Sequence, residues 1–268
     1  MMEYPKISIV TVCYNAVNEV EMTILSVINQ TYPNVEYIVV DGGSTDGTVD
    51  VIRKYDSRIT KWVSEPDKGI YDAMNKGIGM ATGEWLNFMN AGDKFVDMNV
   101  LKNISINFNS LNGVLYGDTV GELFGGKFSL RKADIKKIEN PRNCRMGFTH
   151  QSSFVRTELA KKYPFDLRFK LAADYNMMVS LYNLGYSFKY VSIPISVYDG
   201  HGISAQNVYL HRLECLTVRS PKSTFTNRLT AWLISTKLCT KLWLRSAVSK
   251  RWLDWYYQKF RKHKYYNP

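Results

Sequence analysis

Cysteine is scarce in this sequence, and its spacing excludes several classes of protein. The four cysteines lie far apart and form no C-x-x-C pair: Cys13, Cys144, Cys215 and Cys239. A zinc ribbon needs closely spaced thiolates, and a disulfide scaffold needs more cysteines in a shorter secreted chain. The sequence therefore favours a protein of the reducing cytosol, without structural zinc or disulfides.

Long apolar stretches are also missing. No uncharged apolar run reaches the roughly 18 residues that a membrane-spanning helix requires. A strand pattern already begins within residues 1–10, and these residues contain no apolar signal-peptide core. With 268 residues, 45% of them hydrophobic, the chain is long enough to bury a sizeable core. We expect one main cytoplasmic domain with an appendage.

Acidic residues are nearly absent from the C-terminal segment that starts at His211. Of 35 basic and 24 acidic residues in the chain, this segment holds 13 and two, which leaves 22 of each sign before it. The tail therefore carries the whole net charge of +11. Basic, aromatic segments bind nucleic acid, pack as a helical hairpin or oligomer contact, or lie on a membrane. Apolar faces such as Leu229-Trp232-Leu233, beside Lys237 and Lys241, favour a peripheral site on the inner face of the cell membrane, with nucleic acid least favoured.

The first 110 residues alternate strand and helix patterns. Apolar, β-branched runs predict strands over 7–12, 35–40, 59–64 and 84–89, and helical spacing predicts helices over 20–29, 48–55 and 70–81. This alternation predicts an α/β fold with a Rossmann-like, doubly wound, mostly parallel sheet. Further strands are expected over 111–116, 125–130 and 188–197, and a helix over 171–184. We place boundaries at about residue 110, between two halves of the main domain (1–207), and at residue 208, where a helical extension (208–268) starts.

Polar segments follow four of the predicted strands. They are Thr11–Asn15, Asp41, Glu65–Gly69 and Asn90–Asp93. Ligands of open α/β sheets bind beyond the carboxyl ends of the strands, so these segments indicate the walls of a ligand pocket. The first strand is followed neither by the GxGxxG fingerprint of dinucleotide-binding proteins nor by the basic, Gly-rich triphosphate loop of a nucleotidyltransferase.

Three charged residues of these segments each have two interpretations. Asp41 accepts hydrogen bonds from a nucleobase, or it caps its own turn. Lys76 reaches a diphosphate from a helix whose N-terminus attracts anions, or it lies on a solvated face. Asp93 binds a hard divalent cation, or it is a plain turn residue. Their shared position at the ligand edge of the sheet favours the ligand-binding interpretation of all three.

The chain resembles glycosyltransferase family 2, whose members have a GT-A fold. The motifs are Ser8–Asn15 (SIVTVCYN), Val39–Thr48 (VVDGGSTDGT), Ser64–Asp93 and Phe169–Tyr182, within a resemblance that covers about residues 5–207. Within the family the chain is similar to enzymes that build bacterial capsule, O-antigen or exopolysaccharide. The resemblance implies inverting, Mn²⁺- or Mg²⁺-assisted transfer from a nucleoside diphosphate donor, with UDP-sugars as the first expectation. It also implies a saccharide acceptor linked to polyprenyl diphosphate.

The resemblance assigns roles residue by residue. Nucleotide-sugar contacts are expected from Thr11, Cys13, Tyr14, Asn15, Asp41, Gly43, Asp67, Lys68, Gly69, Tyr71, Asn75, Lys76, Asn90, Ala91 and Gly92. Asp93 is the expected metal ligand, although many relatives read DSDD where this chain reads NAGD. His201, between two glycines, is either a second metal ligand or an exposed loop histidine.

Asp174 matches the catalytic base of the family, although Ala173 stands where relatives often have Glu. A base is required because inverting transfer removes the acceptor hydroxyl proton during attack. The alternative is an aspartate that interacts with a helix N-terminus. His150 and Gln151 are expected on the acceptor side, although a polar strand edge has the same pattern. The reduced NAGD sequence keeps open a second function, a catalytically weakened nucleotide-sugar-binding protein that uses its tail for assembly.

Overall fold

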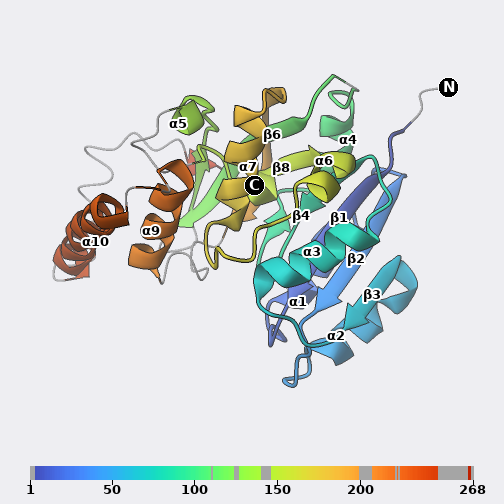
Figure 1. The fold of residues 1–268 in the computed structure, drawn as a ribbon. Coiled ribbons are helices and arrows are strands. Elements are labelled where there is room, and N and C mark those ends of the chain that lie inside the picture. The colour runs from blue at the N-terminus through green and yellow to red at the C-terminus, as the bar shows by residue number, and fades with distance from the viewer. Residues whose placement is uncertain are drawn as a thin grey trace.

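The structure, a computed structural model, describes residues 4–109, 111–123, 127–139, 146–198, 207–220, 222, 224–246 and 265–266. Its described strands join in one sheet that runs through the molecule, with helices on both faces (Figure 1). The sheet orders the strands β10-β7-β6-β8-β4-β1-β2-β3, and β5 and β9 branch from this path. Both halves of the predicted main domain therefore share one sheet.

The N-terminal half contains four parallel strands. They are β1 (Ile7–Cys13), β2 (Val35–Asp41), β3 (Lys61–Ser64) and β4 (Trp85–Phe88). β1 lies between β2 and β4, and β2 lies between β1 and β3. This register sets Cys13 beside Asp41 and Asp41 beside Ser64 at one edge of the sheet. The predicted parallel arrangement of these strands is confirmed.

Alternate residues of the strands enter two separate cores. On one face Ile9 and Val39 pack with α1 (Val20–Ile28) and α2 (Thr48–Lys54). On the other face Val10 and Val40 pack with α3 (Ile70–Met80). All four of these strand side chains are fully buried, which explains the continuous apolar runs of a sheet covered on both faces.

The C-terminal half of the sheet is mixed. β6 (Val114–Leu123) forms an antiparallel hairpin with β7 (Lys127–Arg131), and β8 (Ser153–Arg156) pairs antiparallel with β4 and β6. β9 (Phe188–Tyr198) runs parallel to β6 and antiparallel to β5 (Lys94–Phe95). β10 (Tyr265–Tyr266) adds to the edge at β7. The short strands β5 and β8 were not predicted, because a few residues carry too little periodicity to be recognised.

Helices complete the second half. α7 (Ala173–Asn183) is followed by Leu184 and by Gly185, whose φ of +82° suits the predicted glycine at the helix C-terminus. α9 (Val208–Arg219) packs between α7 and α10 (Thr224–Ser246), and Figure 1 shows α10 at the end of the molecule away from β1–β3. Shorter helical segments are η1 (Asp56–Arg58), α4 (Val100–Ser105), α5 (Lys136–Glu139), η2 (His150–Ser152) and α6 (Thr157–Lys162). Within the described residues, no helix combines the length and apolar character needed to span a membrane.

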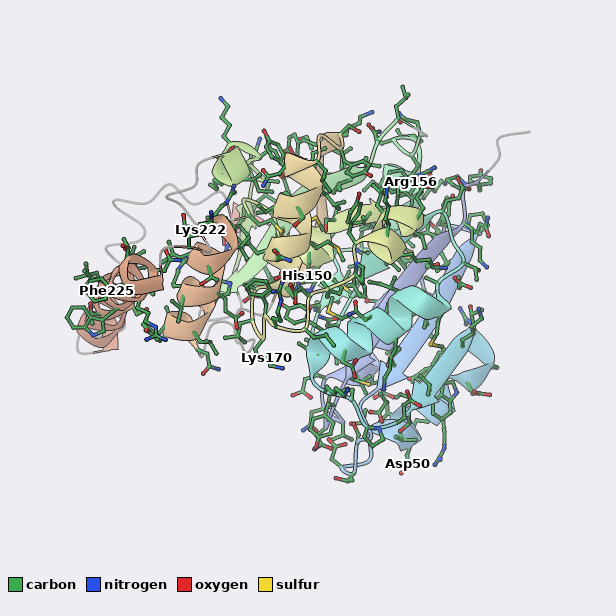
Figure 2. All side chains as sticks on the ribbon, viewed as in Figure 1. Asp50, His150, Arg156, Lys170, Lys222 and Phe225 are labelled. Atoms are coloured by element: carbon green, nitrogen blue, oxygen red, sulfur yellow. The ribbon has the colours of Figure 1, made fainter. Side chains whose placement is uncertain are left out.

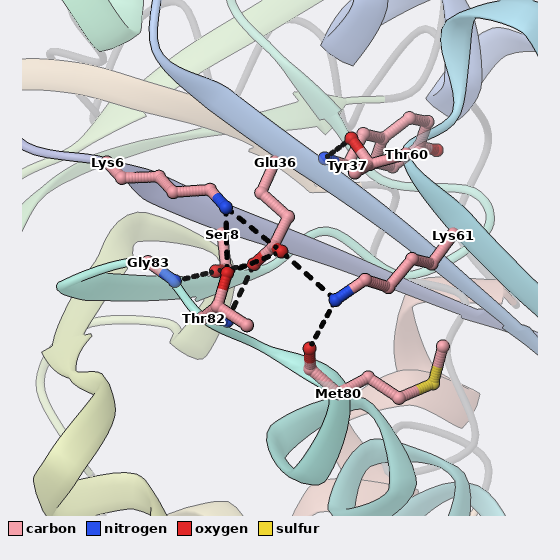
Figure 3. Close-up of polar contacts among 9 residues, drawn as sticks. All are labelled: Lys6, Ser8, Glu36, Tyr37, Thr60, Lys61, Met80, Thr82 and Gly83. Atoms are coloured by element: carbon pink, nitrogen blue, oxygen red, sulfur yellow. Dashed lines mark hydrogen bonds and ion pairs between the residues drawn. The ribbon is translucent and has the colours of Figure 1, made fainter.

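A buried carboxylate ties the amino ends of the parallel strands together (Figure 3). Glu36 is 1% exposed and accepts hydrogen bonds from Ser8 Oγ at 2.6 Å and from Thr82 N and Oγ1 at 2.7 Å each. It also pairs with Lys6 at 3.2 Å and with Lys61 at 3.4 Å. Burial opposes ionisation of Glu36, but these hydrogen bonds lower its pKa from 4.5 to about 2. The network lies at the edge opposite the predicted ligand site.

Candidate active site

Asp41 lies at the carboxyl edge of β2 and is fully buried. Its carboxylate accepts hydrogen bonds from the amides of Gly43 (3.0 Å) and Ser44 (2.9 Å), and from the hydroxyls of Ser44 and Ser64 (2.6 Å for Ser64). Burial raises the pKa of Asp41, but these hydrogen bonds outweigh it and keep the pKa below 3.8. The carboxylate therefore caps its own turn, and contact with a nucleobase stays a prediction.

The loops that follow β1 and β2 are bonded to each other. The amide of Asn15 donates to Ser44 Oγ at 2.7 Å, and the Asn15 side chain accepts from the amide of Thr45 at 3.0 Å. Asn15 adopts a φ of +47°, a left-handed conformation that asparagine tolerates better than most residues. Tyr14 is 65% exposed beside these loops. Asn15 thus links the two loops at this edge, and the Tyr14 side chain beside them is exposed.

Buried side chains of β1 lie below this surface. Thr11 is fully buried and donates to the carbonyl of Met89 at 2.7 Å. Cys13 lies 3.6 Å from Asp41 Oδ1, and burial together with the charge of Asp41 raises the pKa of its thiol. Cys13 is therefore a neutral thiol, and both residues support the ligand edge from inside.

Gly42 permits a close approach of Asp67 to the loop after β2. A Cβ atom at Gly42 would lie 2.4 Å from Asp67 Oδ2 and 3.3 Å from the Tyr14 ring. The other Asp67 oxygen accepts from the amide of Gly69 at 2.7 Å, and Gly69 has a φ of +115°. These contacts fix the turn that leads into α3.

The polar face of α3 is bound to protein groups. Lys76 Nζ lies 2.8 Å from Glu65 Oε1 and donates to the Pro66 carbonyl at 3.0 Å. The Asn75 side chain donates to the Phe165 carbonyl and accepts from the Phe165 amide, both at 2.9 Å. Asn75 therefore joins the two halves of the chain, and Lys76 is held by Glu65 and Pro66, which lie before the start of α3.

Asp93 follows β4 and is 8% exposed. Its Oδ2 accepts a hydrogen bond from Gln151 Nε2 at 2.8 Å. In the same turn, Thr23 Oγ1 accepts from the Gly92 amide and donates to the Asp93 carbonyl at 2.7 Å. The turn is thus anchored on α1, and its carboxylate is held by a residue from the second half of the chain.

Asp174 is at the centre of a hydrogen-bonded group that contains Tyr71, His150 and Tyr175. Tyr71 Oη donates to Asp174 Oδ1 at 3.0 Å, and His150 Nδ1 lies 3.3 Å from Asp174 Oδ2. The Tyr175 amide donates to Oδ1 at 2.8 Å, and His150 Nε2 lies 3.3 Å from the Asn90 side-chain nitrogen. The predicted base therefore connects through His150 to the turn that carries Asp93.

The two central groups shift each other's protonation. Burial disfavours the charged forms of both, but the His150–Asp174 hydrogen bond and the charge of each partner dominate. The pKa of Asp174 lies below 3.8 and that of His150 lies above 6.5. Burial and Asp174 also raise the pKa of Tyr71, which stays a neutral donor. Asp174 is therefore ionised at neutral pH.

A cleft of about 640 Å³ brings these residues together. One part of its lining comes from α3 and the turn after β4, with Tyr71, Met74 and Asn90–Asp93. The other part comes from segments after β6, with Arg131, Lys132, Lys137, Met146–Gln151, Lys170, Leu171, Asp174, Tyr175, Tyr198, His211, Arg212 and Cys215. Figure 2 labels His150 and Lys170 in the middle of the molecule, between α3 and α9. A volume of this size suits a small-molecule site.

Glu214 holds the start of the helix that carries Asp174. Its carboxylate is 9% exposed and accepts from the amides of Lys170 (2.9 Å), Leu171 (2.8 Å) and Ala172 (3.0 Å). Ala172, the N-cap residue of α7, makes no side-chain cap hydrogen bond of its own. The Glu214 carboxylate on α9 therefore caps the N-terminal end of α7.

The predicted site residues fall into two groups. The cleft contains Tyr71, Asn90, Ala91, Gly92, Asp93, His150, Gln151 and Asp174. The adjoining strand edge contains Thr11, Cys13, Tyr14, Asn15, Asp41, Gly43, Asp67, Lys68 and Gly69, and Asn75 and Lys76 follow on α3. His201 lies outside the described residues. The roles assigned to all these residues stay predictions.

The sequence alone predicts neither the basic lining of the cleft nor the role of Glu214. Arg131-Lys132 and Lys136-Lys137 are doublets after a predicted strand, which is also the pattern of an ordinary solvated loop. Glu214 is one of two acids in the basic tail, and this isolation was the one available signal.

The turn after β4 has oxygen atoms of the kind that bind a hard divalent cation. Asn90 Oδ1 is buried and has no hydrogen-bond partner among the described residues, and it belongs to the same short turn as Asp93. Carboxylate and amide oxygens are ligands that Mg²⁺ and Mn²⁺ accept, with phosphate and water completing the shell. The described residues contain no cluster of three His, Cys, Asp or Glu side chains suited to a metal.

Sequence comparison relates the chain to one family. The sequence model described as "Glycosyl transferase family 2" matches residues 8–115. A glycosyltransferase of Mycobacterium tuberculosis (strain ATCC 25618 / H37Rv) is 34% identical over 185 residues, 65% of this chain and 68% of the relative. A "PGL/p-HBAD biosynthesis glycosyltransferase" of M. tuberculosis (strain ATCC 25177 / H37Ra) is 27% identical over 212 residues, 75% of this chain and 79% of the relative. A putative teichuronic acid biosynthesis glycosyltransferase of Bacillus subtilis, TuaG, is 38% identical over 94 residues, 34% of this chain and 37% of the relative.

Solved structures establish the fold. S. aureus TarS 1-349 in complex with UDP superposes with a TM-score of 0.61 at 19% identity, over 84% of this chain and 69% of that one. In a longer TarS structure the matched part is 39% of the chain. Mannosyltransferase PcManGT from Pyrobaculum calidifontis, in complex with GDP-Man and Mn²⁺, gives 0.62 at 17% identity, over 95% and 84%. The GT-A fold expected from the sequence is confirmed, and the chain belongs to glycosyltransferase family 2.

Proposed function

We propose that this glycosyltransferase moves a sugar from a nucleoside diphosphate donor to a saccharide hydroxyl, with inversion at the transferred carbon. The acceptor is a saccharide carried on polyprenyl diphosphate, and the product is part of a bacterial surface polysaccharide. The name of the B. subtilis relative, a teichuronic acid enzyme, supports this product class. The M. tuberculosis relative, named for PGL/p-HBAD biosynthesis, supports a glycan-building role.

One observation carries the proposal. His150 and Gln151 are consecutive, and they contact Asp174 and Asp93 respectively in the same cleft. A base and a leaving-group site must lie within one sugar unit of each other for in-line displacement. The consecutive contacts link Asp174 and Asp93 through neighbouring residues, which supports the proposal that both carboxylates serve one bound donor sugar.

The proposed reaction uses these residues as follows. Asp174 takes the proton of the acceptor hydroxyl, whose oxygen bonds to the anomeric carbon as the bond to the diphosphate oxygen breaks. Tyr71 and His150 hold the carboxylate in place through hydrogen bonds at 3.0 and 3.3 Å. The proton then resides on Asp174, and the nucleoside diphosphate departs with its electron pair.

The donor is proposed as a UDP-sugar, with GDP-sugars as the alternative. TarS is described in complexes with UDP and UDP-GlcNAc, and PcManGT in complex with GDP-Man. Asp93 and Asn90 would hold Mn²⁺ or Mg²⁺, and such an ion neutralises the departing diphosphate. The Mn²⁺ in PcManGT supports this part of the proposal.

An exposed apolar stripe on α10 supports a membrane location. Phe225, Leu229, Trp232 and Leu233, spaced four, three and one residues apart, are 79, 47, 56 and 53% exposed. The buried Asn227, Ala231 and Ser235 form the other stripe of the helix. Aromatic and aliphatic side chains on a basic helix suit the headgroup region of an anionic leaflet. We propose peripheral attachment at the inner face of the cell membrane, where a lipid-linked acceptor is available.

The test is Asp174→Asn, assayed with a panel of UDP- and GDP-sugars with and without Mn²⁺. We expect loss of transfer by about 10²- to 10⁴-fold, with UDP binding retained, because a base contributes about that much. Asp50→Asn, which changes an exposed carboxylate on α2 outside the cleft lining, is the matched control and should leave the rate unchanged. Transfer by Asp174→Asn at the wild-type rate would refute the assignment of the base.

A second function is favoured by one observation. Asp93 is the sole carboxylate of the Asn90–Asp93 turn, which weakens the case for tight metal binding. A nucleotide-sugar-binding protein with weakened catalysis would bind UDP-sugar but show no metal-stimulated donor hydrolysis. Slow hydrolysis with Mn²⁺ therefore separates the enzyme from the binding protein.

A further inference from the structure

The part of the cleft lining that follows β6 is strongly cationic. Five of its side chains are basic, and they come from β7 and the loop after it, from α5, from the segment before α7 and from α9. They are Arg131, Lys132, Lys137, Lys170 and Arg212. The cleft has two carboxylates, Asp93 and Asp174, and both already accept hydrogen bonds from cleft side chains. The cleft therefore carries net positive charge beside the predicted base.

Hydrogen bonds between separate segments fix this cationic wall. Asp118, which is 2% exposed, accepts from the amide of Ala133 at 2.9 Å and so holds the residue after Lys132. The Asp134 amide donates to the Gly147 carbonyl at 3.0 Å, which links the loop to the segment leading to His150. Gly147 has a φ of +87°, and a Cβ there would collide with the Asp134 carbonyl. The backbone under Arg131 and Lys132 thus has a fixed position relative to His150.

Few carboxylates neutralise this wall. Arg131, Lys132 and Lys170 make no ion pair in the described part of the chain, and Lys137 lies 3.9 Å from Asp134. Like charges gathered in a cleft repel each other and raise the local concentration of anions. Three lysines and two arginines suit phosphoryl oxygens, which the arginine fork binds in pairs and the ammonium binds as a point charge.

We propose that this wall is a subsite for an anionic group carried by the acceptor, of the phosphate or diphosphate class. The proposal deepens the function proposed above and rests on it. A uronic acid carboxylate on the acceptor saccharide has related chemistry and is the second source to be distinguished.

The position of the wall assigns it to the acceptor and not to the donor. All five basic residues follow β6, whereas the predicted donor contacts lie on β1–β4 and α3. Arg212 belongs to α9, the helix that packs against α10 and its exposed apolar stripe. An acceptor anchored in lipid beside α10 would bring its phosphate to the α9 side of the cleft. Figure 1 shows α9 and α10 on the side away from β1–β3.

The test compares geranyl phosphate with geraniol, which differ in the phosphate alone. Binding is measured at pH 7.5 with and without saturating UDP, for the wild type, Arg131→Gln/Lys132→Gln and Lys170→Gln. The control, Arg53→Gln/Lys54→Gln on α2, removes the same charges from an exposed helix outside the cleft. Methyl glucuronide and methyl glucoside form a second pair, which tests a carboxylate source.

We expect the wild type to prefer geranyl phosphate over geraniol by at least about tenfold. The double variant should lose most of this preference, Lys170→Gln should lose part of it, and the control should keep it. UDP affinity should be unchanged in all variants. If the wild type instead prefers methyl glucuronide over methyl glucoside, and the cleft variants lose that preference, the subsite binds a uronic acid carboxylate.

Two results would overturn the proposal. One is an undiminished preference in both cleft variants. The other is a parallel loss of UDP affinity, which would assign the wall to the donor diphosphate. If the wild type binds neither UDP nor GDP yet prefers geranyl phosphate, the proposed function fails and the anion subsite stands.

Discussion

Tyr71 Oη donates a hydrogen bond to Asp174 Oδ1 at 3.0 Å, although the two residues lie 103 positions apart in the chain. Tyr71 is on α3, which packs on the parallel strands, and Asp174 is on α7 in the second half. The Asn75 bonds to Phe165 reinforce the same junction. The carboxylate is therefore oriented by the half of the molecule in which the donor contacts are predicted.

Tyr71→Phe should lower kcat by about tenfold, because a hydrogen bond to a charged group is worth roughly 1.5–3 kcal/mol and part of it orients the base. UDP affinity should change by less than about twofold. Tyr55→Phe is the matched control, since it removes a hydroxyl that donates to Glu21 at 2.9 Å on the surface. Steady-state kinetics with a fixed donor would decide. An unchanged kcat in Tyr71→Phe would mean that the bond does not orient the base.

The pH dependence of transfer should follow His150. Its pKa lies above 6.5 because of Asp174, and an imidazolium beside the carboxylate makes Asp174 a weaker base. We expect kcat to fall as pH decreases through that raised pKa, before Asp174 itself titrates below 3.8. In His150→Gln the acid limb should move at least about one pH unit lower. A limb that does not move in this variant would show that another group controls it.

Local patterns in the sequence were sufficient for the strands, helices and ligand edge of the first half. The apolar runs of β1 and β2 and the polar residues after them are short-range signals, so Asp41 and Asp93 could be placed at one edge. Contacts between distant segments were not predictable, since no periodicity records them. Examples are Gln151 with Asp93 and Glu214 with the amide of Leu171.

Two residues that were predicted to contact the ligand also have protein partners in the structure. Lys76 was predicted to face a diphosphate, and in the structure it pairs with Glu65 at 2.8 Å. Asp41 was predicted to meet a nucleobase, and its oxygens bind the loop that follows it. Both groups bind nearby protein donors or acceptors, and sequence spacing does not reveal these partners.

The Glu36 network should make stability depend on pH in the acid range. Its pKa is about 2 in the folded chain and 4.5 when the chain is unfolded. The contribution, about 3 kcal/mol, is fully present above pH 4.5 and is lost as pH falls towards 2. Urea unfolding between pH 3 and 7 should show this loss in the wild type. Glu36→Gln should be less stable at pH 7 and should have a flatter pH profile.

Glu158→Gln is the control for this measurement, because Glu158 is an exposed glutamate whose nearest cation, Arg156, is 3.5 Å away. Its stability should stay within about 0.5 kcal/mol of the wild type. Equal pH profiles for the wild type and Glu36→Gln would contradict the assignment of the acid-range loss to Glu36.

Glu214 should act as a positioning residue for Asp174. It binds the three amides before α7, and Asp174 is in the first turn of that helix. Glu214→Gln replaces one accepting oxygen with a donor that faces those amides. We expect kcat to fall by about 10- to 100-fold with little change in UDP affinity, and stability to fall by roughly 2 kcal/mol. Glu214→Asp, which keeps the charge, should recover part of kcat.

Val179→Ala separates positioning from a general loss of stability. Val179 is 3% exposed on α7, in the cluster that contains Cys215 of α9, and its truncation destabilises the fold without touching the amides that Glu214 binds. At equal loss of stability, Val179→Ala should keep kcat within about threefold of the wild type. If its kcat falls as far as that of Glu214→Gln, the carboxylate has no specific role in orienting Asp174. If it does not, α9 is part of the catalytic unit, because it supplies the group that fixes the start of α7.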